Sequence, residues 1–105
     1  MKTILARITL ISTVQGGRRS PITPLRDFGC PVFFKNIPEL ADHGYDCRLL
    51  VHEAGTEILP GGSEENVAMA FLSPEKVMPH IRVGTKFDLW EGKVIGAGEI
   101  TAIID

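Results

Sequence analysis

The chain has 105 residues, of which 44% are hydrophobic and 23% are charged, and its formal net charge is -2. This length fits one domain spanning residues 1–105, and the composition is that of a globular protein, which excludes a disordered or fibrous chain. The small negative charge excludes attraction of nucleic acid by the overall field of the protein, so nucleic-acid binding would need a local basic patch.

Residues 3–14 alternate in character and predict a first strand, covered on one side and partly on the other. One face of this strand carries Leu5, Thr9 and Ile11, and the other carries Ile4, Ala6, Ile8 and Leu10. Arg7 interrupts the apolar residues, which argues against a secretory signal, and no apolar run is long enough to span a membrane. We therefore expect a cytoplasmic location, where Cys30 and Cys47 would be thiols.

Short stretches with period-two patterns continue along the rest of the chain. The predicted strands cover 31–35, 45–53, 66–72, 85–90 and 94–105. Residues 91–93 are typical of a hairpin turn, and 37–44 could form a helical turn. Gly96 and Gly98 indicate a bulge, a bend or the close approach of another backbone. Six strands with almost no helical periodicity predict an antiparallel barrel or sandwich.

Candidates for catalysis or metal binding are few. Residues 42–47 gather Asp42, His43, Asp46 and Cys47, but strand geometry sends Asp46 and Cys47 to opposite faces, so the cluster does not converge. Neither "GAG" at 96–98 nor "GGS" at 61–63 fits a glycine-rich phosphate-binding motif, and neither precedes a helix whose N-terminus could hold the anion. We therefore expect no enzyme activity, no cofactor and no metal.

Charged residues also occur in three turns or loops. Glu64 and Glu65 are interpreted as a solvated turn, with an acidic knob for a basic partner as the alternative. Arg18 and Arg19 follow two glycines in a long loop over residues 15–30, where guanidinium and backbone N–H groups together could hold phosphate oxygens. Lys93 lies in the last hairpin. The alternative for these basic residues is an ordinary exposed charge at a strand edge.

Four motifs, in order, resemble the third, C-terminal domain of translation elongation factor Tu. Residues 16–21, "GGRRSP", resemble its G-G-R-x-T-P loop, and 84–98, "GTKFDLWEGKVIGAG", resemble its last hairpin. "LPGG" at 59–62 falls at its M-P-G-D turn, and "PVFF" at 31–34 falls at an aromatic strand. The hairpin residues shared with the family are Gly84, Phe87, Gly92, Gly96, Ala97 and Gly98. Order and spacing agree over about residues 7 to 103.

This resemblance implies a closed six-stranded antiparallel barrel and two candidate functions. In the family the matched loop touches the tRNA backbone, which makes Gly17, Arg18 and Arg19 phosphate contacts and Lys93 a further one. The family domain also packs on its GTPase domain, so the corresponding face here should be polar or should present an apolar patch for a partner or a second copy. With Phe33, Phe34 and Phe87 expected in the core, no stacking platform for bases remains. We therefore expect a binding module for a protein partner, a mimic of the factor's domain or an inhibitor-neutralising protein. The alternative is binding of tRNA or structured RNA through the Gly16–Arg19 loop.

Overall fold

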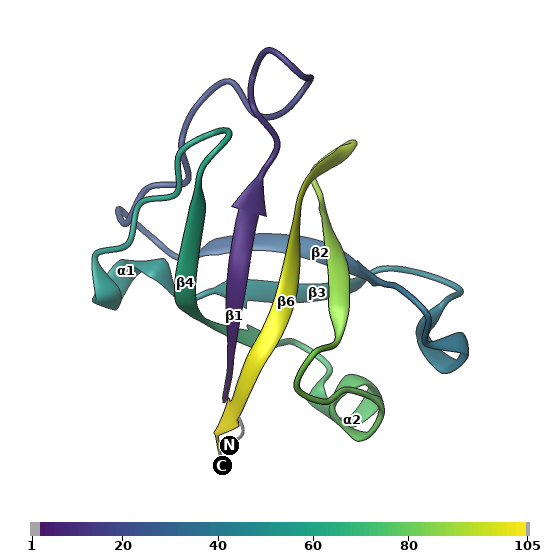
Figure 1. Ribbon diagram of the computed structural model, residues 1–105. Helices are drawn as coiled ribbons and strands as arrows, with labels where there is room; N and C mark the ends of the chain where they lie inside the picture. The colour runs from purple at the N-terminus through teal and green to yellow at the C-terminus, as the bar shows by residue number, and fades with distance from the viewer. Residues whose placement is uncertain (1–2, 105) are drawn as a thin grey trace.

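The fold is known from a computed structural model, which describes residues 3–104. Six strands form a closed antiparallel barrel in the order β1-β4-β3-β2-β5-β6 (Figure 1). The strands are β1 (Thr3–Leu10), β2 (Phe28–Phe34), β3 (Tyr45–Leu49), β4 (Ser63–Phe71), β5 (Lys86–Trp90) and β6 (Val94–Ile104). The short helices are η1 (Pro38–Leu40), α1 (Val51–Ala54), α2 (Pro74–Val77) and η2 (Met78–His80). The predicted antiparallel barrel is confirmed, and closure of the sheet excludes the sandwich.

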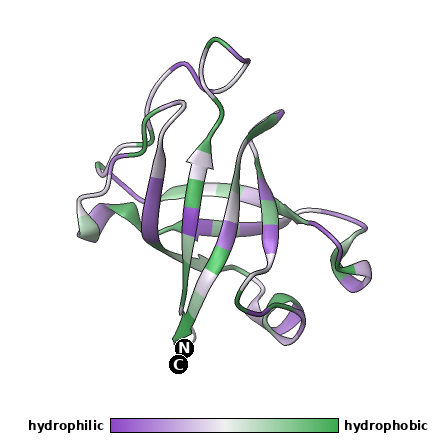
Figure 2. Ribbon diagram, in the orientation of Figure 1, coloured by the Kyte–Doolittle hydropathy of each residue, from purple (hydrophilic) through white to green (hydrophobic). Residues whose placement is uncertain are grey.

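Strand periodicity sets the barrel core. Along β1 every second side chain is buried, and Figure 2 shows hydrophobic and hydrophilic segments alternating on this strand. The buried residues of β1 are Ile4, Ala6, Ile8 and Leu10, each at most 2% exposed. β3 and β5 follow the same rule, with Cys47 and Leu89 fully buried and Phe87 only 1% exposed. The inward faces predicted from the sequence are therefore confirmed.

Two glycines in β6 let neighbouring groups approach its backbone. A Cβ atom at Gly98 would lie 2.3 Å from the Phe87 ring, and one at Gly96 would lie 2.5 Å from the Thr9 carbonyl oxygen. Any larger residue would push the ring or β1 away, since such distances are far inside van der Waals contact. The close approach predicted at these positions is confirmed, although at Gly98 a side chain rather than a backbone approaches.

The predicted strand over 3–14 ends at Leu10, because the chain turns at Ser12. The backbone N–H of Gln15 donates to the Ser12 carbonyl oxygen at 3.1 Å and also to the Ser12 hydroxyl oxygen at 3.3 Å. Serine and its neighbours thus satisfy their polar groups locally, in competition with the sheet. The predicted strand over 45–53 likewise ends at Leu49.

A carboxylate from a distant loop starts α1 directly after β3. The Asp27 carboxylate accepts the His52 backbone N–H at 3.0 Å, and the helical turn ends at Gly55, whose φ is +64°. Val51 remains fully buried, as predicted, but from a helix rather than a strand. Further along, β4 begins at Ser63, so Glu64 and Glu65 lie on a strand and not in the predicted turn. None of the helices formed by residues 3–104 is long and apolar enough to cross a membrane.

Candidate functional site

The glycine-arginine loop closes on itself through Gly17, one of the predicted phosphate contacts. Gly17 is buried, and its N–H donates to the Ser12 carbonyl oxygen at 2.8 Å. A Cβ atom at this position would lie 2.0 Å from the Ile11 carbonyl oxygen, so only glycine fits here. The Thr13 hydroxyl donates to the Arg18 carbonyl at 2.6 Å and closes the loop from the other side. The Gly17 N–H is therefore engaged within the loop.

Arg18 fastens this loop to the turn between β5 and β6. Its Nη1 lies 2.5 Å from Oε1 of Glu91, and its Nε donates to the Ser20 carbonyl at 3.2 Å. The guanidinium carbon also lies 4.9 Å from the centre of the Phe28 ring, a cation–π distance. Only 17% of the Arg18 side chain is exposed. Its charge is thus neutralised by Glu91 and its plane is covered by an aromatic ring.

Arg19 and Lys93 are the two predicted contacts whose cationic groups are open to solvent. The Arg18–Glu91 ion pair brings the loop and the β5–β6 turn to one end of the barrel (Figure 1). Lys93 lies in that turn, where its carbonyl accepts the Glu91 N–H at 2.8 Å. Within residues 3–104 neither Arg19 nor Lys93 forms an ion pair. The structure therefore gathers all four predicted residues at one end but leaves two of them available to a ligand.

An exposed aromatic pair lies on the outer wall of the barrel. Phe33 on β2 and Trp90 on β5 meet edge to face, with ring centres 5.7 Å apart and an interplanar angle of 68°. They are 37% and 38% exposed, and Val94, the register partner of Trp90, is 39% exposed. We call Phe33, Trp90 and Val94 the aromatic patch. The prediction that Phe33 belongs to the core is wrong, because neighbouring residues of a strand face opposite sides and Phe34 takes the inner one.

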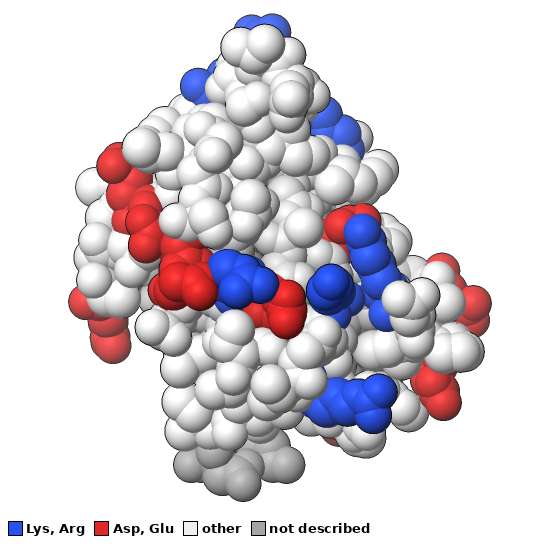
Figure 3. Space-filling view, viewed as in Figure 1, with Lys and Arg blue, Asp and Glu red and all other residues white. Residues whose placement is uncertain are grey.

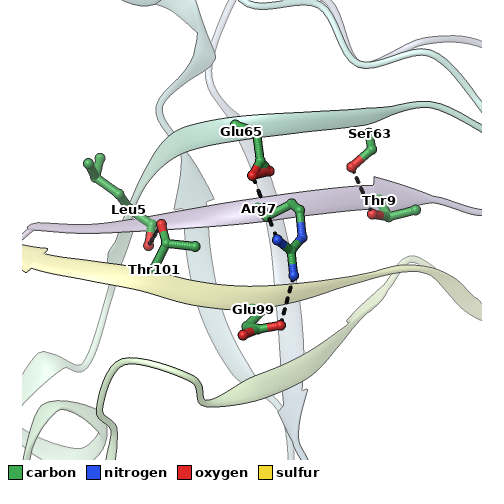
Figure 4. Close-up of polar contacts among 7 residues, drawn as sticks. All are labelled: Leu5, Arg7, Thr9, Ser63, Glu65, Glu99 and Thr101. Atoms are coloured by element: carbon green, nitrogen blue, oxygen red, sulfur yellow. Dashed lines mark hydrogen bonds and ion pairs between the residues drawn. The ribbon is translucent and has the colours of Figure 1, made fainter.

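A polar band crosses the outer wall on β4, β1 and β6 (Figure 4). Arg7 lies between two carboxylates, donating to Glu99 Oε1 at 2.8 Å and approaching Glu65 Oε1 at 3.7 Å. Beside them the hydroxyls of Thr9 and Ser63 are 3.0 Å apart. The outer wall therefore carries both a polar region and an apolar patch.

The two cysteines lie directly opposite each other inside the barrel. Cys30 on β2 is the register partner of Cys47 on β3, and both are free thiols, 5% and 0% exposed. The hydrogen bond from the Cys47 thiol lowers the pKa of Cys30, and the same bond, followed by burial, raises the pKa of Cys47. The sequence reasoning missed this pair because no spacing rule links the two positions. Strand parity and the order of β2 and β3 were the only available signals.

The polar residues near β3 do not converge on a catalytic site. Asp46 is exposed and Cys47 is buried, so the predicted separation of their faces is confirmed. His43 lies against the Tyr45 ring, with centres 4.5 Å apart, and not beside Cys47 in the sheet. Among residues 3–104, no three His, Cys, Asp or Glu side chains lie close enough together to hold a metal ion.

A scan of the sequence against known protein families finds no match, and a search of curated proteins finds no similar sequence. The structure supplies the closed six-stranded antiparallel barrel.

Proposed function

We propose that this chain is a non-enzymatic protein-binding module whose partner docks on the aromatic patch. The observation that carries the proposal is the exposed pair Phe33 and Trp90, edge to face on two paired strands. Tryptophan is among the residues most enriched at interface hot spots, and aromatic residues are enriched in interface cores. Both rings project from a closed barrel, so binding requires little ordering of the backbone.

The packing around Phe33 supports this role. A Cβ atom at Gly44 would lie 3.0 Å from the Phe33 ring and 3.1 Å from Pro31, so a glycine leaves room for the ring against its neighbours. An aromatic side chain buries about 150–250 Å² in full, so about a third of that area remains open on each ring. At ~25 cal/mol per Å², covering it contributes about 2 kcal/mol per ring. Two rings and Val94 would therefore supply the apolar centre of a modest interface.

The resemblance to elongation factor Tu gives the proposal its partner class. In that family the domain is held by a GTPase domain and a second barrel. A barrel of this kind would compete for proteins that recognise the factor, or would neutralise an inhibitor of it. A second copy of the chain is the other occupant that the patch could accept.

Binding of tRNA through the Gly16–Arg19 loop is the second candidate. Arg19 and Lys93 support it, because both are exposed cations at one end of the barrel. Gly17 and Arg18 weaken it, because the first has an engaged N–H and the second is paired with Glu91. With only two cations available, the affinity for tRNA would decrease only weakly as the salt concentration rises, since this decrease scales with the number of phosphates neutralised.

The test compares the double variant Phe33→Ala/Trp90→Ala with Leu25→Ala, which removes an apolar side chain that is 83% exposed and lies outside the patch. Elongation-factor ligands are titrated by calorimetry, and self-association is followed by light scattering. We expect the double variant to weaken partner binding or dimerisation at least 30-fold, with Leu25→Ala unchanged and circular dichroism confirming both folds. Equal binding by the double variant would contradict the proposal. Saturable tRNA binding that is lost in Arg19→Ala/Lys93→Ala would establish the second candidate instead.

A further inference from the structure

A groove of about 760 Å³ opens beside the outer wall, between residues 35–39 and residues 79–86. Three basic side chains line it, Lys35, Arg82 and Lys86, together with His80 and one acid, Glu39. Its volume lies within the range of small-molecule sites. Figure 3 shows basic side chains gathered on one side of this face, next to the polar band.

Two of these cations are held side by side by the sheet. The Lys35 N–H donates to the Lys86 carbonyl at 3.1 Å, so the two lysines are neighbours on adjacent strands, and both side chains line the groove. Like charges opposite each other on paired strands are destabilising. An anion between the two ammonium groups would remove this repulsion.

The nearby acids neutralise only part of the positive charge of the groove. Asp88 lies 3.3 Å from the Lys35 ammonium, but Glu99, the register partner of Lys86, is engaged by Arg7 at 2.8 Å. Within the part of the chain that the structure describes, Lys86 and Arg82 form no ion pair. Arg82 and Lys86 therefore leave two positive charges without an ion pair in the groove lining, where the carboxylate of Glu39 offsets part of this charge.

The backbone under these cations is fixed before any ligand arrives. The Arg82 N–H donates to the Thr85 hydroxyl and the Thr85 N–H donates to the Arg82 carbonyl, both at 3.0 Å. The Gly84 N–H donates to the Ile100 carbonyl at 2.8 Å, which ties this turn to β6. On the opposite wall, Asn36 has a left-handed backbone with φ of +62°, a turn conformation that asparagine adopts readily. A rigid frame lowers the entropy cost of binding.

We propose that this groove binds a small oligophosphate, a chain of two or three phosphoryl groups. Lys35 lies on one wall of the groove, and Arg82 and Lys86 lie on the other. Lysine presents a point charge, whereas arginine presents a planar fork. A carboxylate spreads one negative charge over two oxygens, whereas a terminal phosphoryl group carries more negative charge on three acceptor oxygens, so phosphoryl groups match three cations better. The open side of the groove leaves space for a group attached to the phosphates. This site does not depend on the proposed protein binding, because it uses different side chains.

Calorimetric titration at low salt tests the site with pyrophosphate, ATP and adenosine. We expect pyrophosphate and ATP to bind and adenosine not to bind, because the phosphates carry the recognition. Lys86→Gln and Arg82→Gln should each weaken pyrophosphate binding about tenfold, the effect of losing one charge-assisted hydrogen bond. Arg26→Gln, which removes an exposed cation outside the groove lining, should bind pyrophosphate as the wild type does.

Three results would overturn the proposal. The first is no heat of binding with pyrophosphate at low salt. The second is equal affinity in the wild type, Lys86→Gln and Arg82→Gln. The third is binding of a single-stranded oligonucleotide that depends on Lys86 while pyrophosphate does not bind, which would make the groove part of a nucleic-acid surface. All the variants change exposed side chains, so circular dichroism should show an unchanged fold.

Discussion

Replacing Arg18 with alanine should destabilise the barrel by about 2 kcal/mol. Its pair with Glu91 is charge-assisted, but 48% of the Glu91 side chain is exposed, so solvent screening reduces the contribution to about 1 kcal/mol. The contact with the Phe28 ring adds about 0.5 kcal/mol, and the hydrogen bond to the Ser20 carbonyl adds about 0.5 kcal/mol. For a domain of this size, that loss corresponds to a decrease in Tm of roughly 8–15 °C.

Urea unfolding followed by tryptophan fluorescence measures this loss, because Trp90 is the only tryptophan and precedes Glu91 in the chain. Arg19→Ala is the matched control and should change the free energy of unfolding by less than about 0.5 kcal/mol, as exposed substitutions do. Glu91→Ala should cost about 1 kcal/mol, because it removes the ion pair but leaves the other two contacts of Arg18, and the double variant should cost less than the sum. A stable Arg18→Ala variant that loses RNA binding would refute the structural role and restore the phosphate contact.

Three further outcomes follow from the packing. A mild thiol oxidant should join Cys30 to Cys47 without distorting the sheet, because the two residues are register partners. In non-reducing thermal melts the disulfide should stabilise the protein by roughly 3 kcal/mol, and Cys30→Ser should not respond to the oxidant. An oxidised protein no more stable than the reduced one would contradict this. Gly98→Ala should cost about 1–3 kcal/mol in urea, because its methyl group meets the Phe87 ring, and an unchanged midpoint would show that the ring can move freely. Asp27→Ala should cost about 1 kcal/mol by removing the side-chain acceptor at the start of α1, whereas Asp27→Asn should retain most of the stability.

The barrel could be predicted from the sequence because its strands obey a local rule. Alternation placed Ile4, Ala6, Ile8 and Leu10 on one face, and that face lies in the core. The strand ends could not be predicted, because they depend on contacts between distant positions. α1 begins where Asp27 accepts a hydrogen bond from His52, 25 residues later. No pattern in residues 45–53 contains that information.

The candidate site was harder to predict for the same reason. Arg18 and Arg19 look equivalent in the sequence, but only Arg18 meets Glu91, which lies 73 residues further along the chain. Arg18 joins its own loop to the β5–β6 turn, whereas Arg19 is exposed. The cation-lined groove could not be predicted, because Lys35 lies far from Arg82 and Lys86 in the sequence. The role of a charged residue can be inferred only when its neighbours in the folded chain are known.

The inner and outer faces of β2 and β5 separate the core side chains from those of the two proposed binding surfaces. Their pairing joins Val32 to Leu89 and Phe34 to Phe87, and these four side chains are at most 7% exposed. The outer face of the same ladder carries Phe33, and Lys35 and Lys86 follow at its end. Because parity keeps the two sets apart, substitutions on the outer face remove little core packing. A loss of binding in the outer-face variants with an unchanged unfolding midpoint would therefore report on recognition and not on folding.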